Sequence, residues 1–396
     1  MAQALALRAS APSASAGFKL QVSGSLDDFG ELWPTMEALA GAPSAHGHAF
    51  QCRDHLRVWL DTIGAALGVR PVFVGVRSAA GAPLLFLPLG IRKHRGLRIL
   101  GFLDGGVCDY NAPILFDGAA GLAPDHTRAL WESICRAAPR FDVALLEKCP
   151  EFVGSIRNPL YDLTAEPWPM SGHRLLLGPD TPAEALEKTR DLKDSIRKRK
   201  RIAEIGTLTF NVARERDEID AVFATFVRQK SQRYLETLGH PGFDVPGQQS
   251  YYHELTRRLS GRGVQLAYLS VDAEIVATAW SLISARHFYY LMCAYEAGRW
   301  AKYSPGRLLM EELIAWAQSQ GIEVFDLGIG DEAYKLKWRQ QDFALGGAVL
   351  PRTAAGYLYR TGLGLRRSAK AHLPSFVIRA AKQALSKDRT RMAARR

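Results

Sequence analysis

Residues 303–338 read YSPGRLLMEELIAWAQSQGIEVFDLGIGDEAYKLKW, and this stretch decides the fold. Pro305 and Gly306 end the preceding strand, and apolar residues then recur at helical spacing until Gly321 closes the helix. A short strand, 324–327, and a polar turn follow. A Ser-Pro-Gly loop that leads into a helix presents backbone N–H groups at the positive end of the helix dipole, which suits a phosphate. The stretch therefore predicts a loop, a helix, a strand and a turn, with an anion site where the helix begins.

The same stretch resembles the GNAT-superfamily acyltransferases of the cellulose-biosynthesis (CelD/BcsL-like) branch. The resemblance is dense over these 36 residues and looser elsewhere. The residues that carry it are Ser304, Pro305, Gly306, Leu308, Leu309, Phe325, Asp326, Gly328, Gly330, Asp331, Glu332, Tyr334, Lys335 and Trp338. The resemblance implies an acyl-CoA donor, either acetyl-CoA or a longer acyl-CoA, and an amine or hydroxyl acceptor.

Two segments are expected to bind the donor. The loop before the helix would hold the coenzyme A pyrophosphate, with an arginine at its mouth adding a charge-assisted bond. By resemblance, the central strand 277–281 would splay from its neighbour and line the pantetheine, leaving N–H groups for the thioester oxygen. The predicted donor-binding residues are Thr278, Ala279, Trp280, Ser304, Pro305, Gly306 and Arg307.

Polar groups gather in the turn after strand 324–327 and form the expected acceptor site. An amine that attacks a thioester must lose a proton, which a carboxylate or an ordered water can take. Tyr334 would reprotonate the leaving thiolate, and Lys335 would hold a phosphate or an acidic acceptor. An ordinary solvated turn is the alternative interpretation. The predicted catalytic residues are Asp326, Asp331, Glu332, Tyr334 and Lys335.

Composition narrows the class of protein. The 396 residues exceed one typical domain, and 47% of them are hydrophobic, as in a globular protein with a core. The five cysteines show neither CxxC pairing nor zinc-ligand spacing, which favours reduced thiols in the cytoplasm and predicts no metal site. HExxH and GxSxG motifs are absent, which argues against a metalloprotease or an α/β-hydrolase.

A strand–strand–strand–helix–strand pattern occurs twice along the chain, which suggests an internal duplication. The expected elements are strands 72–76, 84–91, 97–102 and 143–146 with helix 127–137, and strands 265–271, 275–283, 287–294 and 324–327 with helix 307–320. We therefore predict an α/β fold with mixed α+β sheets, in two tandem GNAT-like domains. FemAB-like relatives of the family carry such a tandem, in agreement with this prediction.

The predicted boundaries follow composition. They are an N-terminal tail 1–17, a first GNAT-like domain 18–170, a working GNAT domain 171–350 and a basic tail 351–396. A Pro-rich linker spans 158–182, and Thr181 is expected to cap a following helix. The first domain lacks the Ser-Pro-Gly loop, because its corresponding segment is DGGVCDYNAPIL (104–115), so we expect it not to bind coenzyme A.

Charge is concentrated in the tail. Residues 351–396 hold 12 Lys and Arg and one acid, whereas the other 350 residues hold 39 bases and 39 acids. The net charge of +11 is therefore no argument that the folded body binds nucleic acid. The tail would lie on an anionic membrane surface or be a disordered solubilising segment. We expect a cytoplasmic protein, with possible peripheral contact at the inner face of the membrane through 351–396.

Several interpretations stay open. The basic run Arg197–Arg201 is either a solvated helix face or a cradle for a phosphate-bearing substrate, including a nucleotide- or lipid-linked sugar or a tRNA. The loop 241–247 is either a lid or an ordinary connection. Asp109 and Tyr110 resemble a family Asp-Tyr pair that would close the cleft between domains, although a packing role is equally consistent.

Three functions are consistent with these features. The first is acyl-CoA-dependent N- or O-acyl transfer to a sugar, polysaccharide or cell-envelope precursor. The second is aminoacyl transfer from charged tRNA, as in FemAB-like enzymes. The third is a non-catalytic accessory of a membrane-bound polysaccharide synthase. The sequence does not specify the acceptor, the acyl chain length or the oligomeric state.

Overall fold

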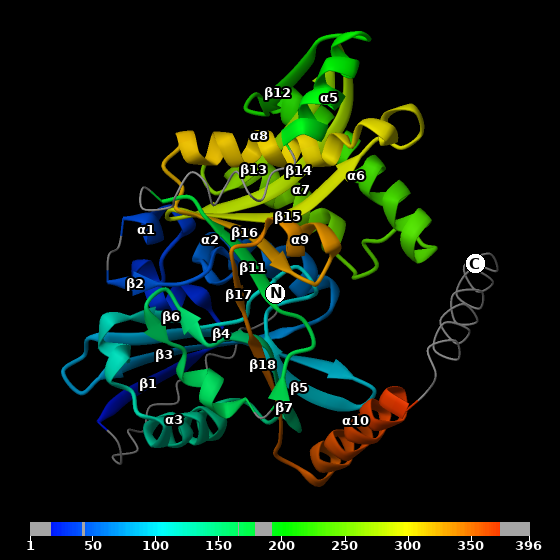
Figure 1. Ribbon diagram of the computed structural model, residues 1–396. Coiled ribbons are helices and arrows are strands. Elements are labelled where there is room, and N and C mark those ends of the chain that lie inside the picture. The colour runs from blue at the N-terminus through cyan, green and yellow to red at the C-terminus, as the bar shows by residue number, and fades with distance from the viewer. Residues whose placement is uncertain (1–16, 42–43, 165, 179–191, 373–396) are drawn as a thin grey trace, which may run out of the picture.

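The structure is a computed structural model, and it describes residues 17–41, 44–164, 166–178 and 192–372. Two large mixed sheets dominate it, the first built mainly from the N-terminal half and the second from the C-terminal half (Figure 1). The sheets are stacked one above the other in Figure 1, with helices between them and on their outer faces. The predicted α/β fold class is confirmed.

The first sheet has the strand order β1-β3-β4-β5-β7-β18-β10, with β6 and β2 on a branch from β4. Its strands are β1 (Phe18–Ser23), β2 (Ala45–His46), β3 (Arg70–Ser78), β4 (Pro83–His94), β5 (Leu97–Phe102), β6 (Ile114–Phe116), β7 (Val143–Pro150), β10 (Glu166–Pro167) and β18 (Leu345–Pro351). A separate hairpin pairs β8 (Phe152–Val153) with β9 (Ile156–Arg157). The helices of this half are α1 (Met36–Ala40), α2 (Arg53–Trp59) and α3 (Pro124–Ala137).

The second sheet has the order β12-β13-β14-β15-β16-β11-β17. Its strands are β11 (Gly172–Leu176), β12 (Leu208–Val212), β13 (Val264–Val271), β14 (Glu274–Ser284), β15 (His287–Tyr295), β16 (Val324–Ile329) and β17 (Gln341–Phe343). Its helices are α5 (Leu192–Ala203), α6 (Arg216–Leu238), α7 (Gln248–Leu259), α8 (Pro305–Ser319) and α9 (Ala333–Trp338). Helix α8 packs on one face of the sheet, and α6 and α7 pack on the face toward the first half (Figure 1).

The internal duplication has a clear structural counterpart. In each half three antiparallel strands are followed by a helix and then by a strand parallel to the third, as β3-β4-β5-α3-β7 and β13-β14-β15-α8-β16. Every strand and helix of the predicted repeat is present within a few residues of its expected bounds. The alternation of apolar residues located the strands, because one strand face in each sheet is buried.

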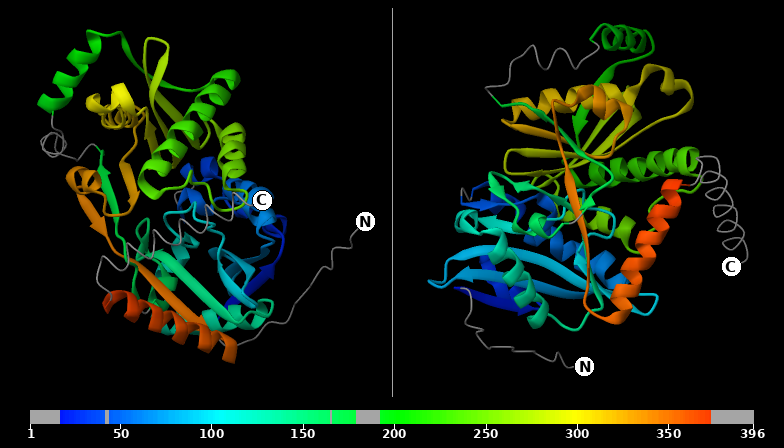
Figure 2. Two further views of the ribbon diagram at one scale, coloured as in Figure 1. Left: turned by 90° about the vertical axis from the view of Figure 1, so that its right-hand side faces the viewer. Right: turned by 60° about the horizontal axis from the view of Figure 1, so that its bottom comes forward.

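The two sheets divide the chain near residue 170, between β10 and β11, but they do not divide it at residue 350. The predicted second domain, 171–350, includes all of β18 except Pro351, yet β18 pairs with β7 and belongs to the first sheet. Strand β11 lies inside the predicted linker and pairs with β16 and β17 of the second sheet. The chain therefore crosses between the sheets after β10 and again after β17 (Figure 2).

Part of the predicted tail is helical. Helix α10 (Ala354–His372) packs against β18 and β7, and the side chain of Thr353 caps its first turn by accepting from the Gly356 N–H at 3.3 Å. Residues 373–396 lie outside the described part of the chain, as do 1–16 and the helix expected after Thr181.

The two halves share one hydrophobic core. This cluster joins Trp33 and Trp59 of the first half to Phe226, Tyr251 and Trp280 of the second. Each of these side chains is at most 2% exposed. Further core clusters belong to the first sheet and to the α8 face of the second. Because the shared cluster is continuous, the halves are expected to unfold together, and groups on facing turns are held at fixed distances.

Within the described residues, none of the helices is both long and apolar enough to span a membrane. The same residues contain no group of three or more His, Cys, Asp or Glu side chains arranged to hold a metal ion.

Candidate active site

The central feature of the second sheet is the place where β15 and β16 part. Their parallel pairing runs only from His287↔Val324 to Tyr289↔Asp326, although β15 continues to Tyr295 and β16 to Ile329. A register shift on the other edge of β15 leaves Leu291 as a bulge opposite β14. Beyond Tyr289, the β15 edge that faces β16 has no strand partner among the described residues. Its backbone groups are therefore available to a ligand.

The splay was predicted one strand too early. Strand β14, which contains Thr278, Ala279 and Trp280, is paired along both edges, for example Ala267↔Ala279 on β13 and Ala279↔Cys293 on β15. Its backbone N–H and C=O groups are hydrogen-bonded to the neighbouring strands on both sides. The side chains are also occupied, because Thr278 Oγ1 donates to Gln229 at 2.8 Å and Trp280 Nε1 donates to Thr256 at 2.8 Å. The free edge at this position in the sheet is that of β15.

The predicted anion loop follows β15 after one short 3-10 helix, η6 (Gly298–Tyr303). Ser304 adopts the left-handed conformation, with φ 52° and ψ 52°, and Pro305 opens α8. This turn lets the chain reverse into α8. Pro305 has no N–H, and the N–H groups of Arg307 and Leu308 donate to the Ser304 carbonyl at 3.0 and 3.2 Å, so in the first turn of α8 it is the Gly306 N–H that has no partner among the described residues.

The Gly306 Cα lies close to β15, since a Cβ there would be 3.0 Å from the Tyr295 ring and 3.3 Å from Cys293 Sγ. A side chain at position 306 would therefore make Tyr295 or Cys293 shift by a few tenths of an ångström.

Cations and carboxylates of α5 surround this loop. Lys198 Nζ donates to Ser304 Oγ at 2.8 Å and pairs with Asp194 at 2.7 Å. Arg307 contacts Asp194 at 3.4 Å and Glu311 at 3.2 Å. The basic run Arg197–Arg201 is thus only partly exposed to solvent, and part of its charge is paired, since Arg199 pairs with Glu312 at 2.6 Å. Lys198 is the member of the run that reaches the loop.

Asp326 lies where the pairing of β16 with β15 ends, and both of its carboxylate oxygens accept hydrogen bonds. It is 1% exposed, and it accepts from Tyr110 Oη at 2.6 Å, from the Gly328 N–H at 2.7 Å and from His287 Nε2 at 3.1 Å. Burial alone would raise its pKa, but the bonds from His287, Tyr110 and Gly328 hold the pKa of Asp326 below its usual value. This carboxylate joins β16 of the second half to Tyr110 of the first.

A histidine and a tyrosine extend the network. The His287 ring stacks on Tyr289 with centroids 4.1 Å apart, and the Tyr289 hydroxyl shares a 3.1 Å hydrogen bond with His48 Nδ1. Burial lowers the pKa of His48 to about 3, so this ring is neutral at physiological pH. Hydrogen bonds in this network therefore join His48 and Tyr110 of the first half to β15 and β16 of the second, which fixes the relative positions of these segments.

Asp109, on the 104–111 turn of the first half, faces the GxG turn of the second. Its Oδ2 accepts from the Ile329 N–H at 3.2 Å, and it lies so close to Gly328 that a Cβ there would be 2.3 Å from Oδ2. Gly328 has φ +75°, a further reason for glycine at this position. Burial, opposed by Lys148 and Lys335, raises the pKa of Asp109 to about 6. A carboxylate with this pKa is suited to act as a general base near neutral pH.

The predicted acceptor turn divides into a buried and an exposed part. Lys335 is 6% exposed, and its Nζ donates to the Ile329 carbonyl at 2.5 Å and pairs with Glu332 at 3.0 Å. Tyr334, by contrast, is 43% exposed on α9. Asp331 is held at the surface by His173, with 3.2 Å between Oδ1 and Nε2. Tyr334 is thus the accessible acid of the turn, and Lys335 mainly orders its backbone.

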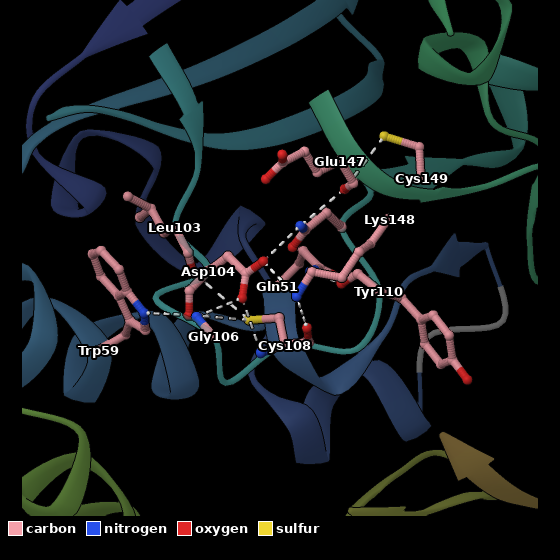
Figure 3. A network of polar contacts seen from close by, with 11 residues as sticks. Gln51, Trp59, Leu103, Asp104, Gly106, Cys108, Tyr110, Glu147, Lys148 and Cys149 are labelled. Carbon is pink, nitrogen blue, oxygen red and sulfur yellow. Dashed lines mark hydrogen bonds and ion pairs between the residues drawn. The ribbon is translucent and has the colours of Figure 1, made fainter. Parts of the chain in front are cut away.

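The sequence analysis gave Asp109 a role between the domains or in packing, but it did not single out Lys148 or His287. Asp109 bonds to the Ile329 N–H of the other half, and Lys148 is held by Asp104 on a distant turn (Figure 3), contacts that local pattern does not encode. The signal for Asp109 was the Asp-Tyr pair after a Gly-rich turn, and its partner could not be predicted.

Comparison with known proteins agrees with this architecture. Residues 188–336 match the family model described as an acetyltransferase (GNAT) domain. No curated protein matches the chain in sequence. Most of the second half is therefore similar in sequence to a GNAT acetyltransferase domain.

Solved structures extend the likeness to both halves. FemX is 11% identical, with a TM-score of 0.54, and the match covers 86% of this chain and 99% of FemX. L-PGS from Bacillus licheniformis is 14% identical over 80% of this chain and 97% of its own, with a TM-score of 0.46. A tandem GNAT protein from the clavulanic acid biosynthesis pathway is 14% identical over 84% and 98%, with a TM-score of 0.45. At these identities the FemX match shows a shared tandem fold.

Proposed function

We propose that this protein transfers an acyl group from a coenzyme A thioester to an amine or hydroxyl, with the donor bound between β15 and β16. The observation that carries the proposal is the unpaired edge of β15, with the Gly306 Cα of the Ser304–Arg307 loop packed close to Tyr295 and Cys293 of that strand. An extended pantetheine would form hydrogen bonds with the free edge of β15, in the place where a neighbouring strand would otherwise lie. The pyrophosphate would then reach the N-terminus of α8, where helix dipole and N–H groups favour anions.

The chemistry follows from the groups at the mouth of this opening. The acceptor nucleophile attacks the thioester carbonyl, and a free N–H of β15 stabilises the oxyanion. Asp109 takes the proton of the nucleophile, since its pKa of about 6 leaves it ionised at neutral pH. The carbon–sulfur bond then breaks, and Tyr334 donates a proton to the thiolate. Lys335 keeps the Ile329 carbonyl and the GxG turn in place for both steps.

For the acceptor we propose a sugar, a polysaccharide or a cell-envelope precursor, as the resemblance to the CelD/BcsL-like branch implies. The acceptor would enter at the junction of the halves, because Asp109 comes from the first half and Tyr334 from the second. In this proposal Thr278, Ala279 and Trp280 support the donor site from behind, as the strand against which β15 is aligned.

Aminoacyl transfer from tRNA is a second candidate because the α5 cations lie beside the anion loop. The two functions differ in the donor that binds. Lys198 would contact the coenzyme A phosphates in one case and the tRNA backbone in the other. A non-catalytic accessory role would require neither donor to bind.

Calorimetry with acetyl-CoA, longer acyl-CoAs and charged tRNA distinguishes these functions. Lys198→Gln should weaken coenzyme A binding by about tenfold, which corresponds to about 1.4 kcal/mol. Lys200→Gln is the matched control, because Lys200 is on the same helix and exposed. Gly306→Val should weaken binding at least as much, but it also crowds Tyr295. If acyl-CoA binds neither wild type nor control, or if Lys198→Gln binds it unchanged, the donor site is misplaced.

A further inference from the structure

The end of the first sheet where β5 and β7 begin, near the start of α10, carries a basic surface that the proposed reaction does not use (Figure 1). Arg70 of β3 lies opposite Ile91 of β4. Lys93, two residues after Ile91, lies opposite Arg98 of β5. Because opposite residues and alternate residues share one face of a sheet, Arg70, Lys93 and Arg98 project from the same face.

Two neighbouring cavities open onto these cations. The first, of about 500 Å³, has an apolar wall from Leu67 and Ile91 and is also lined by Arg140, from the connection between α3 and β7. The second, of about 510 Å³, shares Arg98 and Arg140 with the first and reaches the start of α10. The cations that line one or both cavities are Arg70, Lys93, Arg98, Arg136, Arg140 and Arg352. Among the residues that the structure describes, neither lining includes an aspartate or a glutamate.

Little of the charge around the first cavity is neutralised by a carboxylate. Asp142 accepts from Arg98 Nε at 3.2 Å and from Arg98 Nη2 at 3.0 Å, and this bidentate bond fixes the guanidinium. Within the described part of the chain, Arg70, Lys93 and Arg140 pair with no carboxylate. All three are exposed, so their charged ends are free to turn toward a ligand.

The cations found only in the second cavity are more engaged. Arg136 lies 3.9 Å from Glu132, and the Arg352 guanidinium lies 5.8 Å from the centre of the Phe141 ring. The first cavity is therefore the better anion site of the two.

The pairing of Lys93 with Arg98 is unfavourable by itself, because like charges directly opposite each other destabilise a sheet. The pair does not reflect a basic body, since residues 1–350 hold 39 bases and 39 acids. An anion bound in the first cavity would attract both side chains and so offset their mutual repulsion.

We propose that the first cavity is a binding site for a phosphate group, held by Arg70, Lys93 and Arg140. Guanidinium groups suit this ligand because their forked N–H groups match the spacing of phosphate oxygens. Leu67 and Ile91 would contact the part of the ligand next to the phosphate. The phosphate belongs either to a soluble phosphate ester or to a lipid headgroup, and both present the same anion. This site shares no lining residue with the proposed acyl-transfer site, so its test does not depend on catalysis.

Calorimetric titration of the full chain with inorganic pyrophosphate, in about 0.15 M salt, tests the site. Arg70→Gln/Arg140→Gln should weaken saturable pyrophosphate binding by about tenfold or more. The matched control is Arg216→Gln/Arg257→Gln, which removes two exposed charges of the second half and should bind as wild type does.

Absence of saturable binding, unchanged binding in the site variant or equal losses in both variants would overturn the proposal. Equal losses would mean that pyrophosphate senses only the total charge of the chain. Coenzyme A should bind wild type and both variants alike, so failure of the proposed donor site would appear as a separate result.

Flotation with vesicles of phosphatidylcholine, with and without phosphatidic acid, identifies the source of the phosphate. If a lipid supplies it, the site variant should float less than the control variant on phosphatidic acid, and pyrophosphate should compete with the vesicles. If a soluble ester supplies it, the two variants should float alike while pyrophosphate binding is lost only in the site variant. Loss of flotation without loss of pyrophosphate binding would overturn the proposal, because it would indicate a diffuse basic surface and no phosphate site.

Discussion

Replacing Asp109 with asparagine tests the site, because burial raises the pKa of the Asp109 carboxyl and so favours its neutral form. Its folded pKa is about 6, against an ordinary value of 3.8. A raised carboxyl pKa means that the native state binds the proton more tightly than the unfolded chain does. The stabilisation is therefore fully present below about pH 3.8 and is lost as pH rises through 6.

The pKa difference sets the magnitude. One pKa unit corresponds to about 1.4 kcal/mol, so a difference of about two units costs up to about 3 kcal/mol when Asp109 ionises. Asp109 is partly exposed, and solvent screening reduces this to about 1–2 kcal/mol. Asparagine keeps the acceptor for the Ile329 N–H but has no charge to ionise.

The assay is urea denaturation of wild type and Asp109→Asn at several values between pH 4 and pH 8. The free energy of unfolding of the variant, relative to that of wild type, should rise by about 1–2 kcal/mol, mostly between about pH 4 and pH 6, and stay level above that range. Asp104→Asn is the control, since it alters a carboxylate on the same turn that pairs with Lys148. A difference between Asp109→Asn and wild type that is the same at all pH values would refute the assignment of a raised pKa.

Three further outcomes are expected. Tyr110→Phe should lower the free energy of unfolding by about 1–3 kcal/mol, because it leaves buried Asp326 with one donor fewer; urea curves that overlay those of wild type would contradict this. Tyr334→Phe should reduce turnover by about 10²–10⁴-fold while coenzyme A affinity stays within twofold, and unchanged turnover with the true acceptor would exclude it as the acid. Exposed Leu358 and Leu365 on α10 should contact anionic vesicles, so changing both to glutamate should abolish flotation, and flotation that persists in the double variant or is absent in wild type would exclude that surface.

Local sequence pattern predicted the elements well and their partners poorly. The two repeated strand–helix patterns were located within a few residues, because each strand buries one face and each helix has an apolar stripe. The Ser-Pro-Gly loop also begins a helix as expected. These features depend on residues that are close in sequence.

The misplaced features depend on long-range pairing. Which strand edge remains open is decided by the divergence of β16 from β15, so the sequence of β14 could not reveal that its own two edges are filled. Strand β18 returns to the first sheet because β7 has an edge available there. Asp326 was singled out by local pattern, but its hydrogen bond from Tyr110, 216 positions away, could not be predicted.

Hydrogen–deuterium exchange of the full chain, with and without coenzyme A, tests the central claim most directly. Residues 290–295 of β15 present an unpaired edge, and 304–308 begin α8. A pantetheine that pairs with β15 and a pyrophosphate at α8 should slow amide exchange in both segments and leave β5 and β7 unchanged. Protection of β5 and β7 instead, or no protection in 290–295 and 304–308 at saturating coenzyme A, would contradict the account.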